Sequence, residues 1–181
     1  MNGRNLVRVV PGTPKEVGFR NSTLALLASR SVGSDRRLNA FMTLARHRRL
    51  FPVWARFARQ LLRRGELPLV DTELLILRVS HNCQSEYQWQ HHVALAERAG
   101  LPRETIDRVA GGAPGDFDAR QASLLRAADE LHHDHRISDS TWLELTGFLS
   151  DVQLIELCMA VGHYEMLAMT LKSLGVMPDP A

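Results

Sequence analysis

From about residue 36 onward, apolar residues recur every three or four positions, and no stretch alternates apolar and polar residues as a strand does. This period predicts a short helix after Pro102 and longer helices at about 36–48, 51–64, 71–82, 84–99, 117–134, 138–148 and 151–174. Residues 1–35 are rich in proline and glycine, which predicts an irregular arm with one short helix near Leu24–Ala28. The expected fold is all-α, with an N-terminal arm over 1–35 and a single helical domain over 36–181.

Two of the predicted helices begin with recognisable capping residues. Asp71 is expected to cap the apolar helix that follows it, and Ser150 with Gln153 forms a capping-box pattern before the last helix. The stretch 71–79 also resembles 151–159, which suggests two weakly related helical hairpins.

The composition is that of an ordinary globular protein, with 181 residues of which 45% are hydrophobic and 23% charged. Two cysteines cannot form a disulfide framework. No apolar run is long enough to span a membrane, and no secretory signal is readable. We therefore expect a cytoplasmic protein without a membrane partner.

The charges are distributed unevenly. Residues 1–64 carry 14 of the 22 Lys and Arg residues but only two of the 20 acidic residues. The arginines between 46 and 64 alternate with apolar residues at helical spacing. We expect amphipathic helices whose basic faces meet the acidic half of the same chain or of a neighbouring subunit. A nucleic-acid partner is the less favoured alternative.

The stretch 71–100 contains the residues best suited to catalysis. The predicted helix 71–81 is apolar on nearly all sides, so Glu73 is expected to be buried and to require a partner. On the next helix, Ser85, Gln88, Trp89 and His92 share one stripe. A carboxylate and an imidazole that face each other from two packed helices form a general acid/base pair.

The positions of Glu73, of the run Ser85-Glu-Tyr-Gln88 and of His92 resemble the carboxymuconolactone decarboxylase and alkylhydroperoxidase-D-like superfamily. In its redox branch, a Cys-x-x-Cys-x-x-x-His motif opens a helix, with a glutamate twelve residues before the first cysteine. On this chain the glutamate falls on Glu73, the histidine on His92, and the two cysteines on Ser85 and Gln88. The resemblance implies an all-helical fold that assembles as a dimer, trimer or hexamer.

Serine and glutamine cannot replace the two thiols of a dithiol peroxidase. The resemblance therefore favours the decarboxylase side of the superfamily, which uses neither a metal nor an organic cofactor. The expected function is acid/base chemistry on a small cyclic carboxylated or carbonyl substrate, such as a decarboxylation or a related lyase or isomerase step. Glu73 and His92 would move the proton, and the substrate would be bound by Ser85, Tyr87, Gln88 and Trp89.

Three alternatives stay open at this point. Cys83 lies near a predicted helix start, a position that favours a thiolate, so it could support a thiol peroxidase. The chain could instead be a non-catalytic oligomer that binds a small molecule. Glu73 and His92 could also be structural, with Ser85 as a helix cap. The histidines of the run 131–135 are interpreted as favouring a helix C-terminus, and no metal site is expected.

Overall fold

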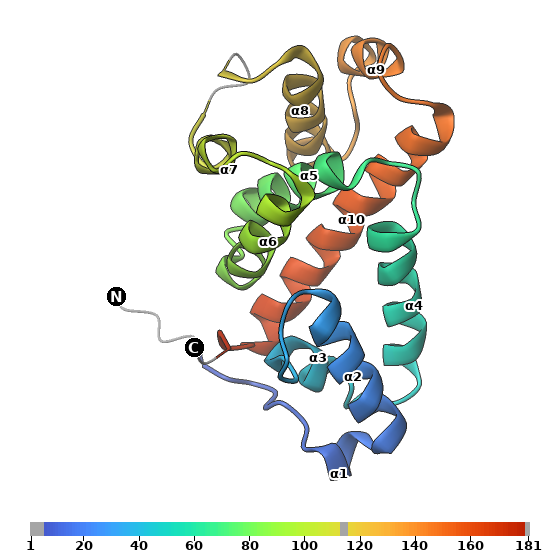
Figure 1. Cartoon of the computed structure of the whole chain (residues 1–181), viewed down its shortest axis with the longest axis vertical. Helices are drawn as coiled ribbons and strands as arrows, with labels where there is room; N and C mark the ends of the chain where they lie inside the picture. Colours follow the sequence, from blue (N-terminus) through green and yellow to red (C-terminus); the bar gives the residue numbers. More distant parts are fainter. Residues whose placement is uncertain (1–5, 113–115, 180–181) are drawn as a thin grey trace. The chain divides into compact units, whose positions relative to one another are not determined.

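The computed structural model describes residues 6–112 and 116–179, and every regular element among them is a helix (Figure 1). In chain order these are α1 (Pro14–Val17), α2 (Phe19–Ser31), α3 (Asn39–Leu44), α4 (Leu50–Arg63), α5 (Leu69–Asn82), α6 (Glu86–Ala99), α7 (Arg103–Val109), α8 (Ala119–His133), α9 (Asp139–Thr146) and α10 (Asp151–Leu174). The all-α prediction is confirmed. The chain divides into two compact units, one of residues 1–59 with 169–181 and one of residues 60–168.

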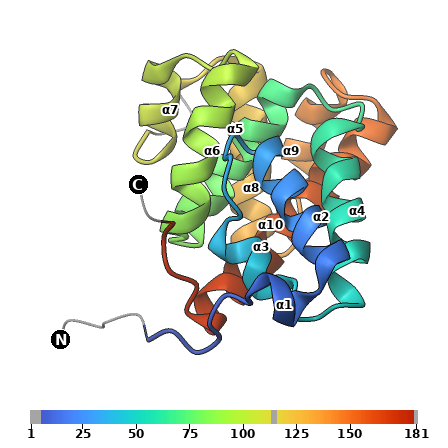
Figure 2. The same cartoon turned by 60° about the horizontal axis from the view of Figure 1, so that its bottom comes forward.

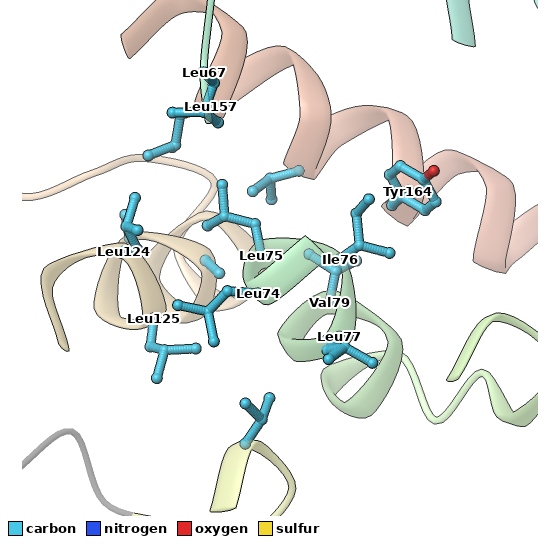
Figure 3. Close-up of a cluster of buried hydrophobic side chains, with 14 of the residues drawn as sticks. Leu67, Leu74, Leu75, Ile76, Leu77, Val79, Leu124, Leu125, Leu157 and Tyr164 are labelled. Atoms are coloured by element: carbon cyan, nitrogen blue, oxygen red, sulfur yellow. The ribbon is translucent and has the colours of Figure 1, made fainter. Parts of the chain in front are cut away.

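Helix α5 forms the centre of the unit 60–168. Its residues 71–77 are all buried, as are Val79 and Ser80. The apolar side chains leave the helix in different directions, toward α8 on one side and α10 on another (Figure 3). Each fully buried aliphatic side chain of this kind stabilises the fold by about 1.5–3 kcal/mol. Helix α5 is therefore held rigidly, and any polar residue on it needs a partner inside the unit.

The unit of residues 1–59 and 169–181 has a core of its own, built by α1, α2, α3 and the start of α4 (Figure 2). Phe51 and Trp54 stack with their ring centroids 5.9 Å apart. Within this unit Arg46 contacts the Glu16 carboxylate, and Arg48 donates to the Glu16 carbonyl oxygen. The expected pairing of the basic helices with acidic residues beyond position 64 stays a prediction.

Several helix boundaries differ from those predicted. Helix α2 spans 13 residues, which is much longer than the short helix predicted near Leu24–Ala28. The prediction for Asp71 is wrong, because α5 begins two residues earlier and the Asp71 carboxylate binds Arg120 at 2.6 Å. The capping box of Ser150 and Gln153 is confirmed, with both of its hydrogen bonds formed.

Helix α10 is the one helix in the described part of the chain that is long and apolar enough to cross a membrane by length and composition. Leu154, Leu157 and Val161 belong to the core of the unit 60–168. Packing therefore accounts for much of its apolar character. The cytoplasmic location stays a prediction.

Candidate functional site

Glu73 and His92 face each other from α5 and α6 within the unit 60–168. Glu73 lies in the first half of α5, on a helix that is apolar on its other faces. His92 lies in the middle of α6, a helix that begins after Ser85 and ends at Gly100, whose φ of 98° suits glycine. Their side chains are only 3% and 7% exposed, so their polar atoms must satisfy each other.

The contact between them has a defined direction. His92 Nδ1 lies 2.7 Å from Glu73 Oε2. In a carboxylate–imidazole pair the Nδ1–H group donates to the carboxylate, which leaves Nε2 as the nitrogen that can accept or donate a proton. His92 Nε2 makes no hydrogen bond to any residue that the structure describes. The geometry therefore orients one imidazole nitrogen for exchange with a third group.

Two buried polar atoms lie on the same face of α6 as His92. Ser85, Gln88 and His92 follow at positions i, i+3 and i+7. Gln88 Nε2 donates to the Tyr164 carbonyl oxygen at 3.2 Å, which points Gln88 Oε1 elsewhere. Ser85 Oγ and Gln88 Oε1 are buried without a hydrogen-bond partner among the described residues. A buried polar atom left in this state costs about 1–3 kcal/mol, so both atoms are available to a ligand.

Helix α10 closes the site with two consecutive residues. The rings of His92 and Tyr164 meet edge to face with centroids 5.1 Å apart. Burial, and then the Glu73 carboxylate, raise the pKa of Tyr164 well above its ordinary value, although Arg63 acts in the opposite direction. Burial, and then the nearby His92, lower the pKa of His163 to about 4. At neutral pH both of these groups are therefore uncharged.

The other predicted substrate-binding residues make different contacts. Tyr87 stacks on His91, with ring centroids 4.6 Å apart, and His91 Nδ1 donates to the Tyr87 carbonyl oxygen. Trp89 packs against the apolar core of the unit. Ser85 is the N-cap of α6 by position, yet its side chain makes no capping hydrogen bond. Its predicted capping role is therefore wrong, and its hydroxyl group stays available.

A second glutamate–histidine pair lies elsewhere in the same unit. His132 Nδ1 lies 2.6 Å from Glu165 Oε1, and Cys83 Sγ donates to Glu165 Oε2 at 3.1 Å. All three residues are half-buried. Cys83 is the C-cap of α5 and lies near the start of α6, which begins three residues later at Glu86. The Glu165 carboxylate therefore accepts from the thiol with one oxygen and contacts His132 with the other.

Sequence reasoning did not assign His132, His163, Tyr164 or Glu165 to any site. The last three are consecutive polar or aromatic residues in the middle of an otherwise apolar helix. Such an interruption, if used, would have indicated a functional face. His132 belongs to a run of histidines, but nothing in the sequence near it reveals that its partner is 33 positions away.

Comparison with known proteins gives a family-level match. The model of the carboxymuconolactone decarboxylase family matches residues 48–130, a range that includes Glu73, Ser85, Gln88 and His92. No protein of curated function matches the chain.

Solved structures resemble a larger part of the chain than the family model covers. An uncharacterized peroxidase-related protein with an alkylhydroperoxidase AhpD core, from Ralstonia eutropha JMP134, is 17% identical with a TM-score of 0.79, over 94% of this chain and 93% of that one. A Cys-to-Ala variant of the debrominase Bmp8, in complex with 2,3,4-tribromopyrrole, is 13% identical with a TM-score of 0.81, over 94% of this chain and 91% of that one. At these identities the likeness establishes the fold.

Proposed function

Because the chain belongs to the carboxymuconolactone decarboxylase and alkylhydroperoxidase-D-like superfamily, we propose that it catalyses a proton-transfer step on a small cyclic carboxylated or carbonyl compound. Decarboxylation is the leading reaction. The observation that carries the proposal is the buried Glu73–His92 contact of 2.7 Å, beside the unpartnered oxygens of Ser85 and Gln88. A structural pair would not need two further buried polar atoms without partners on the same helix face.

In the proposed reaction, His92 Nε2 exchanges a proton with the substrate. Glu73 holds the Nδ1 side of the ring and stabilises the imidazolium that forms when Nε2 is protonated. Burial strengthens this electrostatic support, since water does not screen the pair. Such a positioned acid or base contributes about 10²–10⁴-fold to a rate.

The decarboxylation balances with these groups alone. The bond between the ring carbon and the substrate carboxylate breaks, CO₂ leaves, and the electron pair moves into a conjugated carbonyl group to give an enolate. The His92 imidazolium then gives its Nε2 proton to that carbon. It recovers a proton from water, so one proton is consumed for each CO₂ released.

Ser85 and Gln88 would distinguish the two ends of the substrate. The Ser85 hydroxyl group can donate to a carbonyl or enolate oxygen. The amide nitrogen of Gln88 is directed to the Tyr164 carbonyl oxygen, so only the acceptor Oε1 is left for the substrate. We therefore expect a substrate with an O–H or N–H group on the side opposite its reacting carbonyl.

The test is turnover of a defined panel in D₂O. The panel holds small cyclic 3-oxo carboxylic acids, carboxylated lactones and their decarboxylated ketones, and NMR follows loss of the carboxyl carbon and deuterium entry at the adjacent carbon. His92→Asn and Glu73→Gln should each lower the rate by about 10²–10⁴-fold. His91→Asn is the matched control, since His91 contacts Tyr87 and should leave the rate unchanged.

Two results would contradict the proposal. Undiminished turnover in His92→Asn would remove the acid/base role. Absence of turnover by folded wild-type protein with every panel member would instead favour the non-catalytic binding protein. The peroxidase alternative has its own measurement, because hydroperoxide consumption through Cys83 must disappear in Cys83→Ser.

A further inference from the structure

We propose that Cys83, His132 and Glu165 form a binding site for one divalent transition-metal ion of the Zn²⁺ type. This site is separate from the Glu73–His92 pair and does not depend on the function proposed for that pair. The cluster also departs from the expectation, drawn from the sequence, that no metal site is present.

The first argument is the convergence of three donor atoms. Each residue offers one ligand atom, and these atoms lie within 4.8 Å of one another. Zinc binds sulfur, nitrogen and oxygen ligands at about 2.0–2.3 Å, which places tetrahedral donors about 3.3–3.8 Å apart. The Sγ–Oε2 distance of 3.1 Å and the Nδ1–Oε1 distance of 2.6 Å are a little shorter. A small outward rotation of the side chains would therefore admit the ion.

The second argument is the chemical type of the donors. A thiolate, an imidazole and a carboxylate are the ligands that zinc uses in proteins, and cobalt(II) accepts the same set. Calcium and magnesium prefer sites made entirely of oxygen, so this set disfavours them. Three protein ligands leave a fourth tetrahedral position for water or another small molecule, as catalytic zinc sites do.

The third argument is how the ligands are positioned. Cys83 ends α5, His132 lies in the last turn of α8, and Glu165 lies in α10. These three helices contribute to one apolar core, which holds the three positions in place. The side chains of His132 and Glu165 are 23% and 21% exposed. The donors are thus preorganised yet open enough for an ion to enter.

Residues next to the ligands support this arrangement. Asn82, which precedes Cys83, donates to Asp129 at 2.8 Å, and Arg78 binds the same carboxylate at 2.7 Å. Burial alone would raise the pKa of Asp129, but the hydrogen bonds from Arg78 and Asn82 outweigh it and lower that pKa. Asp129 is therefore ionised at neutral pH and anchors the chain immediately before Cys83.

The order of contacts favours metal binding over a nucleophilic thiol. A cysteine nucleophile is activated by an imidazole that takes its proton directly. Here the Glu165 carboxylate accepts from Cys83 with one oxygen and contacts His132 with the other. The carboxylate therefore occupies the centre of the cluster, where a cation would neutralise it.

Binding would release protons in a countable way. The Cys83 thiol loses its proton to become a ligand, and the His132 nitrogen that binds must carry none. At least one proton therefore leaves for each ion bound, and the apparent affinity should rise with pH.

The test uses the full-length protein with Zn²⁺ and Co²⁺ as probes. Isothermal titration of metal-free protein with Zn²⁺, in two buffers of different ionisation enthalpy, should give one ion per chain and at least one proton released. Co²⁺ should give a sulfur-to-metal charge-transfer absorption band. Cys83→Ser, His132→Asn and Glu165→Gln should each weaken Zn²⁺ binding by at least about 100-fold.

The chain offers matched controls for each change. Cys158→Ser replaces the other half-buried cysteine, and His133→Asn replaces the histidine adjacent to His132. Both should keep the affinity within about threefold, because neither residue belongs to the cluster. Binding that survives in Cys83→Ser, or no saturable binding to folded wild type, would overturn the proposal. Binding lost in His92→Asn and kept in His132→Asn would assign the metal to the other pair and would also overturn it.

Discussion

The unit 60–168 contains two glutamate–histidine pairs with nearly the same contact distance but different burial. Glu73 and His92 are 2.7 Å apart, with side chains 3% and 7% exposed. Glu165 and His132 are 2.6 Å apart, with side chains 21% and 23% exposed. The first pair lies beside neutral buried groups, and the second receives a hydrogen bond from a thiol. Contact distance alone therefore does not decide what such a pair does; burial and the third partner do.

Burial has opposite consequences for the two pairs. In the dry setting of Glu73 and His92, electrostatic support of a transient imidazolium is strong, because no water competes. In the half-exposed setting of Glu165 and His132, water can replace lost hydrogen bonds and an ion can enter. This difference in burial supports the proposals of proton transfer at the first pair and metal binding at the second.

The largest effect is expected when the Glu73 carboxylate is moved away from His92. Glu73→Asp withdraws the carboxylate by one methylene group and should lower turnover about 100-fold, since a displacement of about 1 Å can cost this much. The measurement is the deuterium-incorporation assay with the panel described above. An unchanged rate in Glu73→Asp would show that the distance to His92 does not limit the reaction.

The neutral surroundings of the buried pair predict a loss of stability in mild acid. The pKa of His163 in the fold is about 4 instead of 6.5, so the unfolded chain binds more protons between these pH values. Unfolding free energy should therefore fall as pH drops from about 6.5 toward 4, by about 3 kcal/mol at most from this group. Denaturant unfolding at pH 7 and pH 5, with a chelator present, measures the change.

The matched variants for that experiment are His163→Gln and His135→Gln. His163→Gln should reduce the pH dependence of stability, whereas His135 is exposed and its replacement should not. The groups that face His163 include His92 and the neutral Tyr164 ring. An identical pH dependence in wild type and His163→Gln would contradict the depressed pKa.

Truncation of each glutamate should show the difference in burial directly. Glu73→Ala leaves the buried Nδ1 group of His92 without its acceptor and should lower the unfolding free energy by about 1–3 kcal/mol. Glu165→Ala in metal-free protein should cost less than about 1 kcal/mol, because water reaches His132. Urea denaturation of both variants with wild type provides the values. Equal losses would mean that burial does not distinguish the pairs.

The smallest effect on folding energy, but a visible effect on assembly, is expected at the surface of α10. Val152, Ile155 and Met159 form an apolar row on one face of this helix and are 46%, 63% and 46% exposed. The homo-oligomer expected from the sequence stays a prediction, and this row is a surface on which it can be tested. Ile155→Glu should leave stability within about 0.5 kcal/mol and shift the mass in light scattering toward the monomer. Ser173→Glu, at an exposed position of the same helix, changes the charge by the same amount and serves as the control. An unchanged mass in Ile155→Glu would argue against this surface.

Much of the fold was predictable because helical order is a local property. The period of apolar residues predicts helices close to α4, α5, α6, α8, α9 and α10, and the capping box at Ser150 formed as expected. The same period places Ser85, Gln88 and His92 on one face of a helix. Each of these conclusions needs only neighbours within two turns, so the order of residues along the chain suffices.

The partners of the polar side chains depended on the tertiary structure. Asp71 binds Arg120, which is 49 positions away, instead of capping its helix, and Cys83 meets Glu165, which is 82 positions away. Such contacts arise where packed helices bring distant segments together, and the apolar pattern that drives the packing does not specify which polar groups will meet. The sequence alone therefore determined the helices and the face that carries His92. Tertiary packing decided which carboxylate each histidine contacts, and how much water reaches it.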